Sequence, residues 1–228
     1  MRRFGTNYGG WSLPIDADLG PKSVVYSAGV GEDISFDLLL QDKYGCEVVL
    51  IDPTVRAKVH HDQVQSFYET GEPAFTGDIQ RDYLATISPA KPDFSKIMYV
   101  PKGLWHVRET LKFYKPVNPK FVSHTFISKM YSDEYIMAEV DTVGNIMKDL
   151  GHSRVDLLKL DIEGAELTVL DQMLRDHIYP RYLCVEFDLL LKGQDSGNMT
   201  QNILHFLERK GYRLLENDNW NCTFELTR

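Results

Sequence analysis

The 228-residue sequence has few cysteines, no excess of basic residues and no long apolar run. Its three cysteines, Cys46, Cys184 and Cys222, show no CxxC spacing, which argues against a disulfide framework or a zinc site. The net charge of −8 argues against the basic face that a nucleic-acid backbone requires, so we expect no nucleic-acid partner. No apolar run reaches the roughly 20 residues that span a bilayer, so none is expected to enter a membrane.

The N-terminal residues lack an apolar segment as well. Because MRRFGTNYGG contains no h-region, the sequence predicts no signal peptide and a cytoplasmic protein. A composition of 43% hydrophobic and 25% charged residues indicates one globular domain over residues 1–228. Within this domain we expect a lid segment at about residues 1–20 and an insertion at about residues 71–135.

Apolar runs that end in glycine or aspartate alternate with helical patterns along most of the chain. The alternation predicts an α/β fold whose sheet is doubly wound and mainly parallel. Expected strands occupy residues 24–31 (a strand that runs into a tight turn), 46–51, 155–160 and 182–187, and expected helices occupy residues 34–44, 55–68, 141–150, 163–174 and 199–210.

The C-terminal residues follow a different period. Trp220, Cys222, Phe224 and Leu226 alternate with polar residues, which predicts a strand with one buried face. A turn at 217–219 would join this strand to a partner at 212–215. We therefore expect a C-terminal antiparallel hairpin strand. By analogy at the level of the fold, such a strand distinguishes class I methyltransferases from dinucleotide dehydrogenases.

The first expected strand runs into a glycine turn with the sequence SAGVGED, which contains Ser27, Gly29 and Gly31. Glycines allow the backbone to approach a ligand, and the next helix presents free N–H groups there. A dinucleotide motif would carry a third glycine where Ile34 stands. Glu32 and Asp33 disfavour a pyrophosphate but suit a cofactor with a cationic amino group and a sulfonium, as in S-adenosylmethionine (SAM). The alternative is an ordinary strand-to-helix turn.

Asp52 ends the second expected strand, 21 residues after Gly31. An acid in this place can accept hydrogen bonds from both ribose hydroxyls of a nucleotide. The alternative is that Asp52 caps the following helix, with Pro53 in the first helical position.

A second group of acids lies in the segment LKLDIEGAE. Asp161 falls at the carboxyl end of a strand, the edge that faces the ligand crevice of an open α/β sheet, and Glu163 is expected in the first helical turn. Glu186 and Asp188 end the next strand at the same edge. The alternative for each is an acid that stabilises a helix N-terminus, which we prefer for Glu166. The spacing matches no known metal loop, so no metal is expected.

Other candidates lie outside the expected sheet. Tyr8, Gly10 and Trp11 belong to NYGGW, which could fold over a cofactor or anchor the chain to the core. His124 could act near neutral pH, although a lone histidine is usually a surface or packed residue. His60 and His61 are expected on a helix surface, without a role.

Three segments, VYSAGVGEDISFD, VVLIDPT and VDLLKLDIEGAE, together resemble the FkbM-type methyltransferases and the methyltransferase-like domain family. The NYGGW, GLW and SHT segments resemble the latter as well. The resemblance implies a Rossmann-like class I fold, SAM as methyl donor, and a hydroxyl acceptor on a sugar or natural-product-like molecule. By position, the resemblance implies a cofactor turn of Ser27, Gly29, Gly31 and Asp33, with Asp52 as the ribose acid. Further candidates for cofactor binding are Tyr8, Gly10, Trp11, Leu104 and Asp161.

The chain departs from the family pattern at two positions. Tyr26 and Ser27 stand where many class I methyltransferases carry an acid before their glycines. Asp188 stands where relatives carry a histidine. These departures affect the expected acceptor and the expected catalytic base more than they affect the expected cofactor.

The sequence therefore predicts a SAM-dependent methyltransferase acting on a small-molecule or glycan acceptor. Asp161 is the first candidate base, His124 the second, and Glu163 a reserve. The aromatic residues Trp105, Phe113 and Tyr114 of the insertion are expected to shape the acceptor pocket or to fill a subsidiary core. The alternatives are a nucleotide-dependent oxidoreductase and a SAM-binding protein without turnover. The oligomeric state is left open.

Overall fold

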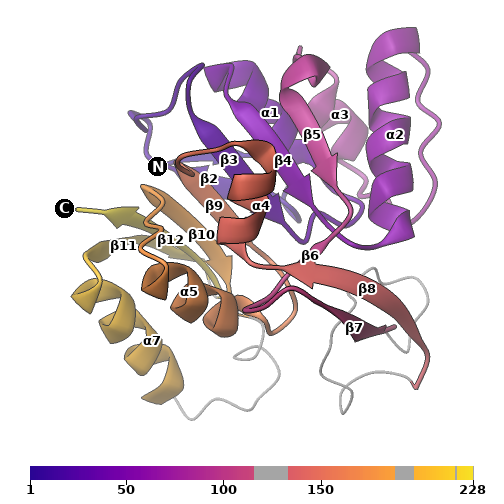
Figure 1. The fold of residues 1–228 in the computed structure, drawn as a ribbon. Coiled ribbons are helices and arrows are strands. Elements are labelled where there is room, and N and C mark those ends of the chain that lie inside the picture. Colours follow the sequence, from indigo (N-terminus) through magenta and orange to yellow (C-terminus); the bar gives the residue numbers. More distant parts are fainter. Residues whose placement is uncertain (116–132, 188–197, 219, 228) are drawn as a thin grey trace.

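A computed structural model describes residues 1–115, 133–187, 198–218 and 220–227 (Figure 1). Its main element is a seven-stranded sheet in which five neighbouring strands are parallel. In spatial order the strands are β11 (Tyr212–Asp218), β12 (Asn221–Leu226), β10 (Tyr182–Glu186), β9 (Leu157–Leu160), β3 (Val24–Ala28), β4 (Glu47–Ile51) and β5 (Ile97–Val100).

The C-terminal hairpin is present as predicted. Strand β12 lies between β10 and β11 and runs antiparallel to both, with Val185 opposite Cys222. Cys222 and Phe224 are buried, and Trp220 lies in the turn just before the strand. A parallel sheet with one reversed strand next to its edge is the Rossmann-like fold of class I methyltransferases, as the sequence predicted.

Helices cover both faces of this sheet (Figure 1). One face packs against α4, α5 and α7, and the other against α1, α2 and α3, so that each face has its own hydrophobic core. The helices are α1 (Ser35–Tyr44), α2 (Val55–Thr70), α3 (Tyr83–Ile87), α4 (Val143–Leu150), α5 (Glu166–Arg175) and α7 (Asn198–Arg209). A hairpin of β1 (Arg2–Phe4) and β2 (Trp11–Leu13) and a 3-10 helix at Phe94–Lys96 complete the description of this part.

A second, three-stranded sheet lies below the carboxyl ends of the main strands in Figure 1. It consists of β6 (Gly103–Leu104), β8 (Tyr135–Asp141) and β7 (Glu109–Tyr114), in that order. The helix expected to begin at Asp141 begins instead at Val143, because Asp141 ends β8 and the Thr142 side chain caps the helix by accepting from the Asn145 N–H. Ala138, Val140 and Asp141 are buried, and the alternation along β8 gives it one inner face.

The expected surface position of His60 and His61 is wrong. His60 is 1% exposed and His61 is 7% exposed. The ring of His60 packs against Phe75 and Tyr83 and shares a 2.7 Å hydrogen bond with the Tyr83 hydroxyl. These partners come from the segment after α2, and a helical pattern alone does not show which face a later segment covers.

Burial lowers the pKa of His60 to about 4. The folded protein therefore favours the neutral ring, and the stability it gains is present above the unfolded pKa near 6.5 and is lost as pH falls from there towards 4. The free energy of unfolding of wild type, measured with urea, should fall between pH 7 and pH 4. For His60→Gln we expect this fall to be smaller by about 3 kcal/mol. The exposed helix residue His205 provides the control: His205→Gln should keep the wild-type pH dependence, and equal behaviour of both variants would contradict the assignment.

Candidate functional site

A cleft opens at the carboxyl ends of β3, β4 and β9. It encloses about 820 Å3 of space not filled by protein atoms, part of which is open to solvent. The small sheet closes it on one side and the N-terminal segment on another. The lining residues that bear on function are Tyr8, Gly29, Gly31, Asp33, Asp52, Leu104, Phe113, Lys159, Asp161 and Glu163.

The glycine turn packs directly on the end of β9. Gly29 has φ +74°, and a Cβ atom on it would lie 1.6 Å from the carbonyl oxygen of Asp161. Any other residue would therefore push the turn off the sheet. The Asp161 N–H donates to the Ala28 carbonyl at 3.1 Å, which joins the same two segments again. The cleft thus brings the predicted glycine turn and Asp161 together.

Asp52 stands beside this turn, as predicted, and is 5% exposed. One carboxylate oxygen accepts from the Gly31 N–H at 3.1 Å. The other accepts from the N–H and the hydroxyl of Thr54, the residue that caps α2. Asp52 therefore organises the turn and supports the helix start while lining the cleft.

The carboxylates of Glu32 and Asp33 are engaged by the protein itself. Glu32 accepts two hydrogen bonds from the Arg56 guanidinium and one from the Asp78 N–H. Asp33 accepts from the Thr6 hydroxyl and from the Ser35 N–H. Both acids thus hold segments around the glycine turn in place, although both also line the cleft.

Lys159 is a site residue that the sequence reasoning did not single out. It is 3% exposed, and its ammonium donates to the Gly29 carbonyl at 3.1 Å and lies 3.3 Å from an Asp161 carboxylate oxygen. Burial acts to lower its pKa, but the charges of Asp161 and Asp37 outweigh burial, so the pKa is raised. The available signal was a lysine in the middle of the apolar run VDLLKL.

Glu163 lies before α5 and not in its first turn, because the helix begins at Glu166. Its backbone has φ +54°, the left-handed region that non-glycine residues rarely occupy, and Gly164 follows with φ +104°. The Glu166 carboxylate accepts from the N–H groups of Ile162 and Gly164, which confirms the helix-terminus role preferred for it. This tight turn aims Glu163 at the cleft.

The N-terminal segment contributes Tyr8 but not Trp11 to the cleft. Tyr8 is 62% exposed at the mouth, and its pKa is raised to about 12 by partial desolvation and then by the charges of Asp161, Glu163, Glu186 and Asp33. Trp11 is 3% exposed in β2 and belongs to the hydrophobic core, so the anchoring role applies to it. Gly10 packs against the Thr6 and Phe4 carbonyls and does not reach the cleft.

Some of the remaining candidate residues line the cleft and others do not. Leu104 and Phe113 line the cleft, whereas Ser27 is buried within β3 and Trp105 packs against the core beside α4 and β8. Tyr114 makes an edge-to-face contact with Tyr135 and is not part of the cleft lining. His124 and Asp188 lie outside the described residues.

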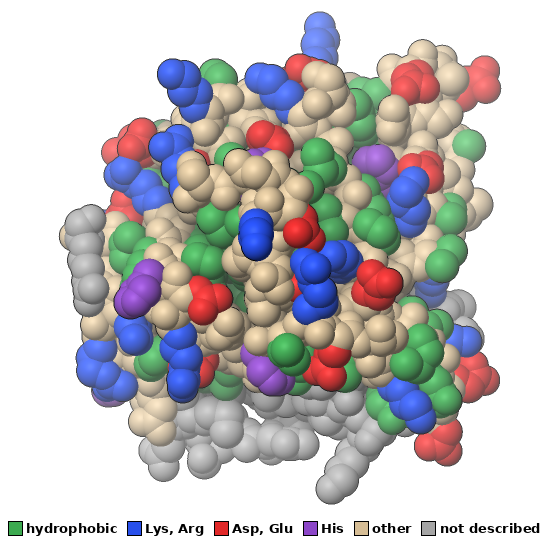
Figure 2. All heavy atoms as spheres, in the orientation of Figure 1, with side chains coloured by type: hydrophobic (Ala, Val, Ile, Leu, Met, Phe, Trp, Pro, Cys, Tyr) green, Lys and Arg blue, Asp and Glu red, His purple; other side chains and the backbone are tan. Residues whose placement is uncertain are grey.

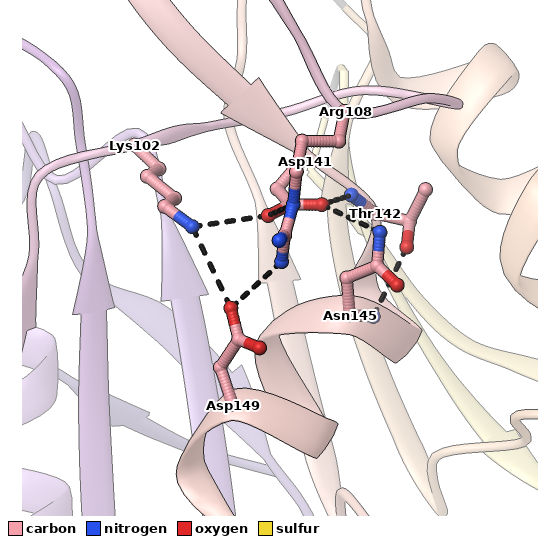
Figure 3. Close-up of polar contacts among 6 residues, drawn as sticks. All are labelled: Lys102, Arg108, Asp141, Thr142, Asn145 and Asp149. Atoms are coloured by element: carbon pink, nitrogen blue, oxygen red, sulfur yellow. Dashed lines mark hydrogen bonds and ion pairs between the residues drawn. The ribbon is translucent and has the colours of Figure 1, made fainter.

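Asp141 anchors the small sheet that carries Leu104 and Phe113 (Figure 3). The carboxylate is fully buried and accepts from Lys102, Arg108, Asn145 and the Thr142 N–H, at 2.7 to 3.0 Å. Asp149 on α4 forms ion pairs with the same two basic side chains, Lys102 and Arg108. The cluster ties β6, β8 and α4 together and so fixes one wall of the cleft.

The described residues add three facts, about surface charge, membrane-spanning helices and metal ligands. On the face shown in Figure 2, basic and acidic side chains are interspersed and do not form a patch of one sign. No helix among the described residues is both long and apolar enough to cross a membrane. Within the same ranges, no three histidine, cysteine or acidic side chains are grouped as metal ligands would be.

The reversed strand beside the sheet edge, the glycine turn packed on β9 and the acid at the end of β4 define a Rossmann-like methyltransferase. Comparison of the sequence with protein families supports the same class. The FkbM methyltransferase domain matches residues 23–214, and the chain belongs to that family.

Individual relatives are distant. The chain is 25% identical over 199 residues to probable methyltransferase-like protein 24 of Rattus norvegicus, covering 83% of this chain and 41% of that protein. It therefore spans less than half the length of this curated relative. Among solved structures, the fibrillarin/Nop5p complex contains a chain that matches with a TM-score of 0.45 and 6% identity, over 92% of this chain and 74% of that one.

The Asp141 cluster generates a stability prediction. Asp141→Ala should lower the free energy of unfolding by about 3 kcal/mol, the lower end for breaking a buried ion pair, because Lys102 and Arg108 are partly solvated. Asp149→Ala removes the partly exposed acid from the same cations and should cost about 1 kcal/mol or less. Urea titrations of both variants measure the difference. If both variants lose the same free energy of unfolding, burial of Asp141 does not increase its contribution to stability.

Proposed function

We propose that this chain is a SAM-dependent methyltransferase and that SAM binds in the cleft at the carboxyl ends of β3, β4 and β9. The observation that carries the proposal is the contact of Gly29 with the Asp161 carbonyl, because a Cβ atom there would clash with that carbonyl and move the turn away from the cleft at the end of β9. Asp52 stands beside the turn, where its carboxylate can accept from ribose hydroxyls. SAM would supply an electrophilic methyl group bonded to its sulfonium.

The described residues that line the cleft have side chains of the chemical types that SAM requires. Leu104 and Phe113 offer apolar surface on one wall, and the acids of the cleft suit the positive charges of SAM. These acids also disfavour a phosphorylated acceptor. We therefore propose a small-molecule or glycan acceptor with a neutral hydroxyl, on a sugar or natural-product-like compound, and neither nucleic acid nor membrane as partner.

Methyl transfer to a hydroxyl needs alignment and a proton acceptor. SAM held between the glycine turn and Asp52 would supply the methyl carbon to the acceptor oxygen, and its sulfur would keep the electron pair of the carbon–sulfur bond. The hydroxyl proton then passes to a carboxylate, for which we propose Asp161, 30% exposed at the side chain and fixed at the end of β9. A positioned base of this kind contributes roughly 10²–10⁴-fold. His124 and Glu163 are the next candidates.

The alternatives have less support. A nucleotide-dependent oxidoreductase would need a third glycine, but Ile34 is fully buried in that place. A SAM-binding protein without turnover would show cofactor affinity and no labelled product. Mass spectrometry of cell extract incubated with the protein and methyl-labelled SAM tests turnover and identifies the acceptor, and a protein that stabilises with NAD and not with SAM would refute the proposal.

Asp52→Ala should weaken SAM binding by about 1.5–3 kcal/mol, the range for hydrogen bonds to a charged group. Isothermal titration calorimetry measures the affinity. Because Asp52 also supports α2, Thr54→Ala is the matched control, which removes the capping hydroxyl but keeps the carboxylate. The ribose assignment fails if both variants lose the same affinity, or if Asp52→Ala binds like wild type.

Asp161→Asn keeps the shape of the side chain and removes its charge. If Asp161 takes the proton, turnover with the identified acceptor should fall at least about a hundredfold while SAM affinity changes little. The measurement combines steady-state kinetics with calorimetry. A collapse of SAM affinity with a near-normal rate at saturation would instead make Asp161 a cofactor ligand.

A further inference from the structure

Two acids meet at the end of neighbouring strands beside the cleft. In the parallel pair β9 and β10, Leu160 lies opposite Val185, so the next residues, Asp161 and Glu186, leave the sheet at the same edge. The two carboxyl groups lie close enough for a hydrogen bond between them. A carboxylate has no proton to donate, so a hydrogen bond between two carboxyl groups requires that one of them be protonated.

The charges around Asp161 and Glu186 favour the state in which one of the two carboxyl groups stays protonated. Lys159 lies beneath Asp161 on β9 and also faces Asp37 of α1, so one buried ammonium is shared between acids. Glu163 approaches from the turn before α5, and Tyr8 approaches from the N-terminal segment. Lys159 is a cation that acts on this pair, and it carries a single positive charge. It cannot balance Asp37, Asp161 and Glu186 if all three are ionised.

We propose that Asp161 and Glu186 hold one proton between them, and that Glu186 is a positioning residue that donates to Asp161 and fixes the direction of its carboxylate. The proposal rests on the proposed function and deepens it, because it assigns Glu186 a part in presenting the base. Glu186 acts through Asp161 and need not touch the acceptor. When the acceptor hydroxyl gives up its proton, the Asp161 carboxylate receives it, and the pair holds two protons until one passes to solvent.

The pKa of Glu186 agrees with this arrangement. Burial first, and then the charge and hydrogen bond of Asp161 and the charge of Glu163, raise it to about 10, while Lys159 acts to lower it. A raised carboxyl pKa means that the proton is present at neutral pH and leaves only as pH rises towards 10. The pair then becomes a dianion, and its mutual repulsion should disturb the direction of Asp161.

Carbon-13 NMR of the ligand-free protein, labelled at glutamate carboxyl carbons, tests the shared proton without any acceptor. We expect one glutamate signal to remain protonated at pH 7 and to titrate well above it, and Glu186→Gln should remove that signal. Asp161→Asn should move its midpoint at least about one pH unit lower, since the neighbouring charge is gone. The proposal is overturned if the signal removed by Glu186→Gln is already ionised at pH 7.

Kinetics test the positioning role. Glu186→Ala removes the donor, so turnover should fall at least about tenfold with SAM affinity within about twofold of wild type. Glu186→Gln supplies an amide N–H to Asp161 and should recover most of that loss, and it should remove the decline of wild-type activity at alkaline pH. Wild-type turnover in Glu186→Ala would overturn the positioning role. Wild-type protein that neither binds SAM nor transfers methyl would instead refute the proposed function, and the NMR result would still decide on the shared proton.

Discussion

The close approach of Gly29 to the Asp161 carbonyl is the constraint on which the rest of the site depends. It places the turn after β3 directly on the end of β9, and it leaves the N–H groups of the turn beside Asp52. Lys159 reinforces the same junction from within the sheet by donating to the Gly29 carbonyl. A side chain at position 29 would separate these segments. The position of the cleft therefore depends on this backbone contact as well as on the side chains that line the cleft.

Around this junction, charged groups serve mainly to hold segments that come from elsewhere in the chain. Glu32 binds Arg56 of α2 and the backbone at Asp78, and Asp33 binds Thr6 of the N-terminal segment. Buried Asp141 does the same for the small sheet. Each acid is paired or hydrogen-bonded, which is the condition under which a buried charge is tolerated. The walls of the cleft are thus supported by ion pairs, whereas its floor is supported by strand pairing.

The sequence predicted the parts of this molecule that depend on local pattern. Apolar runs located β3, β4, β9 and β10, and strict alternation located β12, because each pattern reflects burial along a single element. The glycine turn, Asp52 and Asp161 were placed together because parallel strands end at one edge of a sheet. Their roles toward SAM stay predictions.

Features that depend on a second segment were not predictable in this way. The burial of His60 depends on Phe75 and Tyr83, and the engagement of Asp33 depends on Thr6, which no periodicity connects. Glu163 was expected in a helix because acids favour helix starts, but the turn that carries it adopts a left-handed backbone. Lys159 was overlooked because a lysine in an apolar run becomes meaningful only once its carboxylate partners are known.

The first hairpin of the chain also packs against the last strand of the main sheet. The Thr223 hydroxyl of β12 donates to the Ser12 carbonyl of β2 in a buried hydrogen bond between residues 211 positions apart. During synthesis, β2 is made early, but this partner does not exist until residue 223 has been added. The hairpin therefore cannot complete its packing until β12 is present, so this contact between residues far apart in the sequence forms late in folding.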